Sequence, residues 1–373
     1  MLELTPANAA DYLRRQGRVG PGPVDVEPLG GGVSNAVLRV RTPERVFVLK
    51  QSRPQLRTRD AWFSDLDRVY REQEVMQVLH PLLPAGVVPQ VLFSDRAEYV
   101  FAMSSAPDDA RPWKETLLAG AVDLAIGERT GAVLGRMHDA TARNPTLIDA
   151  FRDRAVFVQL RVDPFYRRIQ ERRPEVAQAV APLIDHMLSA REALCHGDYS
   201  PKNILIIDNS ASGGRKPPDS SPVPRRYPKS GGLRPPLAKD NESSFTLVDY
   251  ETAHQGDPTM DLGFFLSHLL LKAARRPADR HVLFDLTRAF WRGYGAEATF
   301  APRAELERRG VAHCGLCLLA RIDGTSPVEY LSEETRREAV RRLGRGLLLE
   351  RPASWQEALT LAEAALRPLE ASA

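Results

Sequence analysis

The chain has 373 residues, 43% of them hydrophobic, with 51 Lys and Arg, 48 Asp and Glu, and 3 Cys. This composition excludes a fibrous, a wholly disordered and a disulfide-stapled protein, and it predicts a cytoplasmic chain with one large core or two lobes. The most apolar window, residues 262–271, is too short to span a bilayer, and the first thirty residues do not read as a secretory signal, so we expect no membrane association.

The charge is unevenly distributed. Residues 209–244 hold seven Lys/Arg and three Asp/Glu, a surplus of four, so the net charge of +3 becomes −1 for the rest of the chain. A nucleic-acid surface needs a basic stripe on the folded part. The balance therefore predicts no nucleic-acid partner.

A glycine-rich turn lies between two expected strands in VEPLGGGVSNAVLRV. Gly30, Gly31 and Gly32, followed by Ser34 and Asn35, would let backbone amides approach phosphate groups. Because Asn35 replaces the third glycine of GxGxxG, and no GxxxxGK[ST] occurs, neither a dinucleotide fingerprint nor a P-loop is present.

The next strand and helix predict a buried ion pair. Alternation places Lys50, at the end of RVFVLKQ, on the same face as Val46 and Val48. In the helix expected over residues 67–80, helical spacing puts a carboxylate on the apolar face, since Val69, Glu72, Met76 and Leu79 are three, four and three residues apart. A buried carboxylate requires a cation, and Lys50 is the natural partner. The alternative is that Lys50 extends from the strand end to solvent.

The stretch LCHGDYSPKNILI, residues 194–206, joins a polar loop to a buried strand. Asp198 precedes Asn203 by five residues, the spacing by which kinases place a proton-accepting Asp and a metal-binding Asn. Taken alone, the motif could equally be an ordinary turn.

A second carboxylate segment, LVDYETAHQGDPTMDLG, covers residues 247–263. We expect Asp249 to end a strand next to Asp198 and Asn203, so that oxygen ligands suited to Mg²⁺ meet at one end of a hairpin. Glu251 would assist with metal or substrate, or be a solvated turn residue, and the sequence leaves both open.

Residues 209–244 separate these two motifs and contain seven Pro, four Gly and seven Ser. This composition buries too little apolar surface to offset the entropy of ordering, so we expect a disordered insertion in place of a hairpin turn. Nearer the C-terminus, Cys314 and Cys317 invite a zinc or redox interpretation, but their apolar helical context, VAHCGLCLLARI, favours buried packing.

Taken together, the ordered motifs over residues 27–345 resemble the aminoglycoside phosphotransferase and choline kinase superfamily. The resemblance implies an α+β, bilobal protein-kinase-like fold. A small antiparallel-sheet lobe with one key helix would span residues 1–105 and bind the nucleotide, and a mostly helical lobe would span 106–373. The implied cofactors are ATP and Mg²⁺, with Asn203 and Asp249 on the metal, Asp198 as base, and Lys50 held by Glu72.

The same resemblance implies further roles. Residues 99–107 would form the hinge, with the backbone of Met103, Ser104 and Ser105 holding adenine. Asp261 would brace the catalytic loop; the alternative is a helix N-cap.

Within the superfamily, the chain is most similar to the 5-methylthioribose kinases. The similarity includes Asp67-Arg68 and ARIDGTSPVEYL, which makes Arg321 a candidate substrate residue. The chain departs from the family at Asn203, Tyr250 and Ala320.

We therefore expect ATP-dependent phosphoryl transfer to a small-molecule hydroxyl. Residues 301–350 hold nine Lys/Arg and eight Asp/Glu, which disfavours a polycationic acceptor and places a methylthioribose-like sugar ahead of choline or an aminoglycoside. A pseudokinase would lack one of the catalytic residues, all of which are present here, and a protein kinase would show HRD and APE motifs. No role is predicted for His138 or His254, and the sequence does not indicate the oligomeric state.

Overall fold

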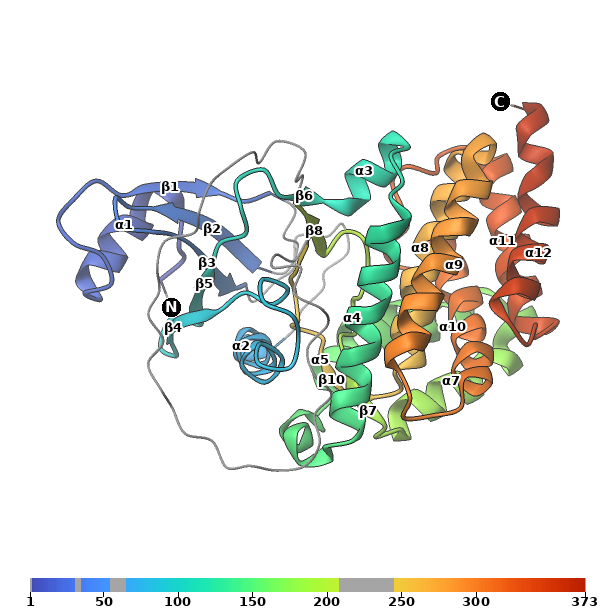
Figure 1. The fold of residues 1–373 in the computed structure, drawn as a ribbon, viewed down its shortest axis with the longest axis horizontal. Coiled ribbons are helices and arrows are strands. Elements are labelled where there is room, and N and C mark those ends of the chain that lie inside the picture. Colours follow the sequence, from blue (N-terminus) through green and yellow to red (C-terminus); the bar gives the residue numbers. More distant parts are fainter. Residues whose placement is uncertain (1, 31–34, 54–64, 208–244, 373) are drawn as a thin grey trace.

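The computed structural model describes residues 2–30, 35–53, 65–207 and 245–372. These residues form two lobes, a sheet with α2 beside it and a larger assembly of helices (Figure 1). The predicted class, α+β and bilobal, is confirmed. Gly31, Gly32, Ser34 and the insertion expected over 209–244 lie outside the described residues.

The N-terminal sheet has the strand order β1-β2-β3-β5-β4, with every neighbouring pair antiparallel. Its strands are β1 (Asp25–Pro28), β2 (Asn35–Arg41), β3 (Val46–Ser52), β4 (Val91–Asp95) and β5 (Val100–Ser104).

Each face of this sheet packs against a different helix, because successive side chains of a strand point to opposite faces. Phe47 and Leu49 pack in one cluster with α1 (Pro6–Arg15), whereas Val48 packs in another with α2 (Arg68–Leu79). Lys50 shares the parity of Val48 and therefore points toward α2. The predicted alternation is confirmed, although β3 continues two residues beyond Lys50.

Helix α2 presents the face that the sequence predicted. Val69, Glu72, Met76 and Leu79 are all 1% exposed or less. The helix begins and ends within one residue of the expected bounds. A carboxylate is thus buried on the side of α2 that faces the sheet.

The second lobe is mostly helical. Its α-helices are α3 (Trp113–Ala119), α4 (Leu124–Ala142), α5 (Ala155–Phe157), α6 (Arg168–Arg172), α7 (Ala177–Ser189), α8 (Thr259–Arg275), α9 (Arg280–Glu297), α10 (Arg303–Asp323), α11 (Glu334–Leu349) and α12 (Trp355–Leu366). The other helical segments are the π-helical η3 (Val158–Arg167) and the short η1 (Pro145–Leu147), η2 (Asp149–Phe151), η4 (Pro174–Val176), η6 (Pro277–Asp279) and η7 (Arg367–Ser372). Helix α8 is apolar over most of its circumference and is accordingly buried on nearly every side.

Short strands carry the polar loops between the lobes. Strand β7 (Ala193–Cys195) pairs with β10 (His254–Gly256), and β8 (Ile204–Ile206) lies between β6 (Arg111–Pro112) and β9 (Phe245–Leu247). The antiparallel pairing of β8 and β9 confirms that the strands flanking the insertion are neighbours. The second of them ends at Leu247, two residues before Asp249, earlier than expected.

The cysteines are packing residues, as predicted. Cys314 and Cys317 are free and fully buried in α10. Burial raises the pKa of Cys317 to about 12, so its thiolate is scarce at neutral pH. None of the helices that the structure describes is long and apolar enough to cross a membrane.

Helices α4 and α9 approach each other at glycines. A Cβ on Gly293 would lie 1.9 Å from the main-chain oxygen of Glu128, and one on Gly131 would lie 2.0 Å from that of Phe290. Backbone oxygens cannot move aside as a flexible side chain can, so these positions require glycine.

Gly293→Ala should therefore lower the free energy of unfolding by about 1–3 kcal/mol or more, the usual cost of overpacking. The matched control is Gly346→Ala in α11, where the nearest atom to a new Cβ is the end of the Glu350 side chain at 3.2 Å. Alanine there should be neutral or stabilising, because it favours helix. Urea unfolding of both variants is the measurement, and equal stability changes would contradict the packing.

Candidate active site

Lys50 is buried between two carboxylates from different parts of the chain. Its Nζ lies 2.6 Å from Glu72 Oε2 and 2.6 Å from Asp249 Oδ1. Burial alone would lower the pKa of Lys50, but the charges of Asp249 and Glu72 outweigh burial and raise it. The lysine is therefore cationic, and the predicted pair with Glu72 is present.

Asp249 follows β9 in a left-handed conformation with φ 72°. This conformation costs a residue with a Cβ about 1–2 kcal/mol, and the next residue helps to hold it, since Tyr250 N donates to Glu72 Oε1 at 3.3 Å. Although burial opposes ionisation, Lys50 holds the pKa of Asp249 below its usual range. An ionised carboxylate is thus fixed beside the lysine.

The loop between β7 and β8 brings Asp198 and Asn203 together. Asn203 Nδ2 donates to the main-chain oxygen of Asp198 at 2.9 Å and to its Oδ2 at 2.8 Å. The main-chain oxygen of Asn203 accepts from Val248 N at 3.0 Å, which ties the loop to the strand leading to Asp249. Because its amide nitrogen is committed to Asp198, Asn203 has its Oδ1 left to offer a cation.

Asp261, the third residue of α8, braces this loop as the resemblance implied. Its carboxylate accepts from His196 N at 2.6 Å and from Gly197 N at 2.8 Å. Asp261 is completely buried. The alternative of a helix N-cap is wrong, because Pro258 is the residue at that position.

His196 holds the loop through hydrogen bonds of its side chain, whereas Gly197 is required because it has no side chain. His196 Nδ1 accepts from Asp198 N at 3.2 Å while Nε2 donates to the Val248 oxygen at 3.2 Å, and burial lowers its pKa, so the ring is neutral. Gly197 has φ 76°, and a Cβ there would lie 2.6 Å from the Thr252 oxygen. Only glycine satisfies both the conformation and the space.

Arg161, in η3, contacts Asp198 and was not predicted. Its Nη2 lies 2.7 Å from Asp198 Oδ1, and its Nε donates to the Gly197 oxygen at 2.9 Å. A guanidinium and the Asn203 amide therefore fix both oxygens of the Asp198 carboxylate. The sequence around Arg161, QLRVDPFYRR, has no motif that would have identified it.

His138 also has a role that the sequence did not indicate. It is buried in α4, with Nε2 3.2 Å from Asp261 Oδ2 and Nδ1 3.1 Å from the Tyr294 hydroxyl. Helices α4 and α9 thus support the carboxylate that holds the loop of Asp198 and Asn203. The sequence could have indicated that His138 lies on the inward face of a helix, but it did not indicate that Asp261 is its partner.

Glu251 is buried and paired, so the alternative of a solvated turn residue is wrong, while assistance with metal or substrate stays a prediction. It is 6% exposed, and its Oε2 accepts from Asn35 Nδ2 at 2.8 Å and lies 3.2 Å from Arg68 Nε. Asn35 begins β2, directly after the glycine-rich turn, and Arg68 begins α2. Glu251 thus links the segment after Asp249 to both elements of the sheet lobe.

The expected hinge is the end of β5 and the residues that follow. Met103 lies within the strand, and Ser104 N donates to the Gln90 oxygen at 2.8 Å. Ser104 N is therefore occupied. In the described part of the chain Ser105 N has no hydrogen-bond acceptor, so it is the amide that remains for a ligand.

Arg321 is located near the end of α10. It donates to the main-chain oxygen of Ser326 and to its Oγ, and its guanidinium lies 5.8 Å from the centre of the Phe165 ring. The Arg161 guanidinium lies 5.7 Å from the same ring. The candidate substrate arginine is thus brought to the side of the loop where Arg161 meets Asp198.

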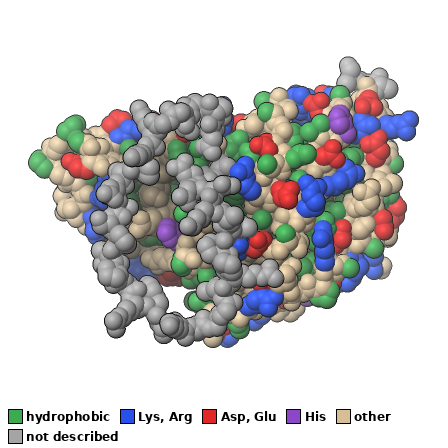
Figure 2. Space-filling model, viewed as in Figure 1, with side chains coloured by type: hydrophobic (Ala, Val, Ile, Leu, Met, Phe, Trp, Pro, Cys, Tyr) green, Lys and Arg blue, Asp and Glu red, His purple; other side chains and the backbone are tan. Residues whose placement is uncertain are grey.

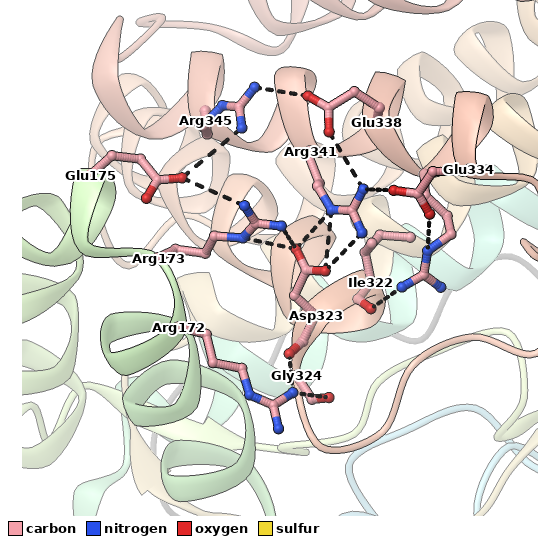
Figure 3. A network of polar contacts seen from close by, with 11 residues as sticks. Arg172, Arg173, Glu175, Ile322, Asp323, Gly324, Glu334, Glu338, Arg341 and Arg345 are labelled. Atoms are coloured by element: carbon pink, nitrogen blue, oxygen red, sulfur yellow. Dashed lines mark hydrogen bonds and ion pairs between the residues drawn. The ribbon is translucent and has the colours of Figure 1, made fainter.

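An ion-pair network anchors α10 two residues beyond Arg321 (Figure 3). The Asp323 carboxylate accepts from Arg341 at 3.0 Å and from Arg173 at 2.6 Å. Figure 2 shows Lys and Arg side chains interspersed with Asp and Glu over the helical lobe. The network joins the end of α10 to α11 and to Arg173, the residue that follows α6, and thereby holds the part of α10 that carries Arg321.

The donors at this site fit a divalent cation. Three carboxylates, those of Glu72, Asp249 and Glu251, stabilise the charged form of Lys50. Hard oxygen atoms from Asp249 and Asn203 are the ligand type that Mg²⁺ prefers. The arrangement can hold an anionic nucleotide through the lysine and its metal through the acids.

The sequence of this chain is similar to that of known phosphotransferases. A family model described as the phosphotransferase enzyme family matches residues 25–213. The methylthioribose kinases of two Yersinia pseudotuberculosis strains, serotype IB PB1/+ and serotype O:3 YPIII, are each 24% identical, covering 93% of this chain and 92% of theirs.

Two solved structures are similar over most of their length. Spectinomycin phosphotransferase in complex with ADP and spectinomycin is 11% identical with a TM-score of 0.48, covering 98% of this chain and 99% of that one. Macrolide 2'-phosphotransferase from Brachybacterium faecium is 18% identical with a TM-score of 0.43, covering 92% and 98%.

The acid stability of the loop region should depend on His254. Its ring stacks on Phe157 at 3.7 Å and its Nδ1 lies 3.0 Å from the Thr252 oxygen, and burial lowers its pKa to about 4. The unfolded chain protonates this histidine below its ordinary value near 6.5 while the folded chain does not. Its contribution is therefore complete above about pH 6.5 and is lost as the pH falls toward 4.

His254→Asn keeps an amide donor for Thr252 but removes this titration. Between pH 7 and pH 4 the variant should lose about 3 kcal/mol less unfolding free energy than the parent chain. His281→Asn, at an exposed position, is the control and should follow the parent curve. Parallel curves for all three proteins in urea unfolding would contradict the prediction.

Proposed function

Because the chain belongs to the phosphotransferase enzyme family, we propose that it transfers the γ-phosphoryl group of ATP to a hydroxyl group of a small molecule. One observation carries the proposal. The Lys50–Glu72 pair from the sheet lobe meets Asp249 at the point where Asp249 also adjoins the Asp198–Asn203 loop. Connected contacts thus hold Lys50, which would bind phosphate, and Asp198, which would accept the proton.

In the proposed reaction Asp198 accepts the proton of the acceptor hydroxyl. The hydroxyl oxygen bonds to the γ-phosphorus as the bond from phosphorus to the β–γ bridging oxygen breaks, and ADP leaves. Arg161 and Asn203 orient the Asp198 carboxylate toward the acceptor. Since little covalent chemistry falls to the protein, positioning and charge carry most of the catalysis.

The nucleotide would lie along the sheet lobe. Lys50, held by Glu72, would contact the phosphates, and Asn203 and Asp249 would hold Mg²⁺, which neutralises charge on the phosphates. The backbone of Met103 to Ser105 would hold adenine, with Ser105 N the available donor. The glycine-rich turn, Gly30 to Gly32 with Ser34 and Asn35, would cover the phosphates.

For the acceptor we propose a methylthioribose-like sugar. The relatives named methylthioribose kinase match almost the whole chain. Arg161 pairs with Asp198, and Arg161 and Arg321 both lie near the Phe165 ring, so both would face the acceptor. Guanidinium groups accommodate hydroxyls or anions and repel ammonium groups. An aminoglycoside or choline-type acceptor is the second candidate, on family resemblance.

The two carboxylates should fail in different ways. Asp198→Asn should reduce kcat about 10²- to 10⁴-fold with nucleotide affinity nearly intact, the scale of losing a general base. Asp249→Ala should abolish Mg²⁺-dependent nucleotide binding. The measurements are steady-state kinetics and nucleotide binding by calorimetry with and without Mg²⁺. Arg292→Met, at an exposed site on α9, is the control, and small, equal effects of the two carboxylate changes would refute the roles.

The acceptor is tested by ATP consumption with methylthioribose, choline, homoserine and kanamycin offered separately. Turnover should be highest with methylthioribose, and Arg321→Ala should raise KM for the acceptor more than it lowers kcat. Turnover with kanamycin or choline alone would overturn the acceptor assignment while leaving the phosphotransfer intact.

A further inference from the structure

Lys272 is a buried lysine without a carboxylate partner. The residue is fully buried in α8, and its Nζ donates to the His268 oxygen at 3.1 Å. The centre of the Tyr330 ring is 5.7 Å from Nζ. In the ranges that the structure describes, Lys272 forms no ion pair, and a buried ammonium without a counter-charge costs several kcal/mol.

Further cations surround Lys272. Lys114 Nζ lies 5.7 Å from the same Tyr330 ring and pairs with Glu329. Burial first, and then the charges of Lys114 and Arg321, lower the pKa of Lys272 to about 7. Burial together with the charges of Arg321, Lys272, Lys114 and Arg161 lowers the pKa of His268 well below its usual range, so the histidine adds a neutral ring.

This cluster continues to the proposed base. The centres of the His268 and Phe264 rings are 5.0 Å apart, and the Arg161 Cζ atom lies 5.6 Å from the centre of the Phe264 ring. Arg161 pairs with Asp198. A chain of contacts therefore leads from Lys272 through the α8 residues His268 and Phe264 to Arg161, which pairs with Asp198.

The charges of the cluster do not balance. Its basic groups are Lys114, Arg161, Arg321 and the partly protonated Lys272, while their carboxylate partners among the described residues are Glu329 and Asp198. Hydrogen-bond donors are also in excess, because Arg321 Nε and the Tyr330 hydroxyl are buried and have no hydrogen-bond partner among the residues that the structure describes. An anion would supply both the missing charge and the missing acceptors.

We propose that the acceptor molecule carries an anionic group, a carboxylate or a phosphate, that binds at the cluster of Lys272, Lys114, Arg321 and Tyr330 while its hydroxyl faces Asp198. The proposal rests on the proposed function, since it names the substrate class of the same site. It predicts that acidic sugars or sugar phosphates are better acceptors than neutral sugars of the same size, methylthioribose included.

The turnover experiment uses acceptor pairs matched in carbon skeleton. Ribonate is compared with ribitol, and ribose 5-phosphate with ribose, so that a carboxylate and a phosphate are tested separately. With the full chain, kcat/KM for at least one anionic member should exceed that of its neutral partner and of methylthioribose about ten- to a hundredfold, the range for a hydrogen bond to a charged group. Lys272→Met should remove most of this ratio, and Arg292→Met, which removes one exposed charge, should leave it unchanged.

A binding experiment does not depend on turnover. Calorimetry without ATP should show that ribonate or inorganic phosphate binds the parent chain and the Arg292→Met chain, and binds Lys272→Met about tenfold or more weakly. Because Lys272→Met removes an uncompensated buried charge, the variant should fold. Lys114→Met, at a more exposed position, is the second variant and should weaken binding in the same direction.

The outcomes separate the two proposals. Phosphorylation of neutral acceptors as fast as of anionic ones, or an anion preference that survives Lys272→Met and Lys114→Met, would overturn the anion site and leave the phosphotransfer in place. Anion binding that depends on Lys272, without turnover of any acceptor, would support the anion site and overturn the phosphotransfer.

Discussion

The site geometry depends on the ion pairs that the Lys50 ammonium makes with Glu72 and Asp249. Lys50 comes from β3, one of its carboxylates from α2, and the other from the segment that follows β9. Glu251, two residues after Asp249, makes a second link to the sheet lobe by contacting Asn35 of β2 and Arg68 of α2. Because Lys50 and Glu72 are buried, removal of Lys50 would leave the carboxylates of Glu72 and Asp249 without their shared counter-charge. The sheet lobe is therefore held to Asp249 by electrostatics as much as by apolar packing.

The catalytic loop is positioned from the opposite direction by the helical lobe. Asp261 receives two main-chain N–H groups of the loop, and His138 and Tyr294 support Asp261 in turn. A loop with few apolar side chains cannot be fixed by packing, so its geometry depends on hydrogen bonds whose acceptors are completely buried. Asp261 positions Asp198 through the backbone N–H groups of His196 and Gly197. Only a change to proline would remove such a donor.

Sequence reasoning recovered what local spacing encodes. Helical periodicity identified Glu72, strand alternation identified Lys50, and the five-residue interval identified Asp198 and Asn203. Pairings between distant residues were not accessible, because burial of a polar side chain indicates that it has a partner without saying which. His138 meets Asp261 across 123 residues and Glu251 meets Asn35 across 216. Arg161 and Lys272 were missed for a further reason, since an isolated basic residue in a helical segment normally indicates a solvated face.

The glycine of the HGD sequence has a consequence for control of the enzyme. Protein kinases have an arginine at this place in the HRD sequence, and their activation segments are ordered when arginine binds a newly added phosphate. At Gly197 the left-handed backbone and the Thr252 oxygen, 2.6 Å from where a Cβ would lie, exclude such a side chain. A single replacement at Gly197 therefore cannot supply that arginine. The loop is held instead by its internal hydrogen bonds and by those that Asp261 accepts.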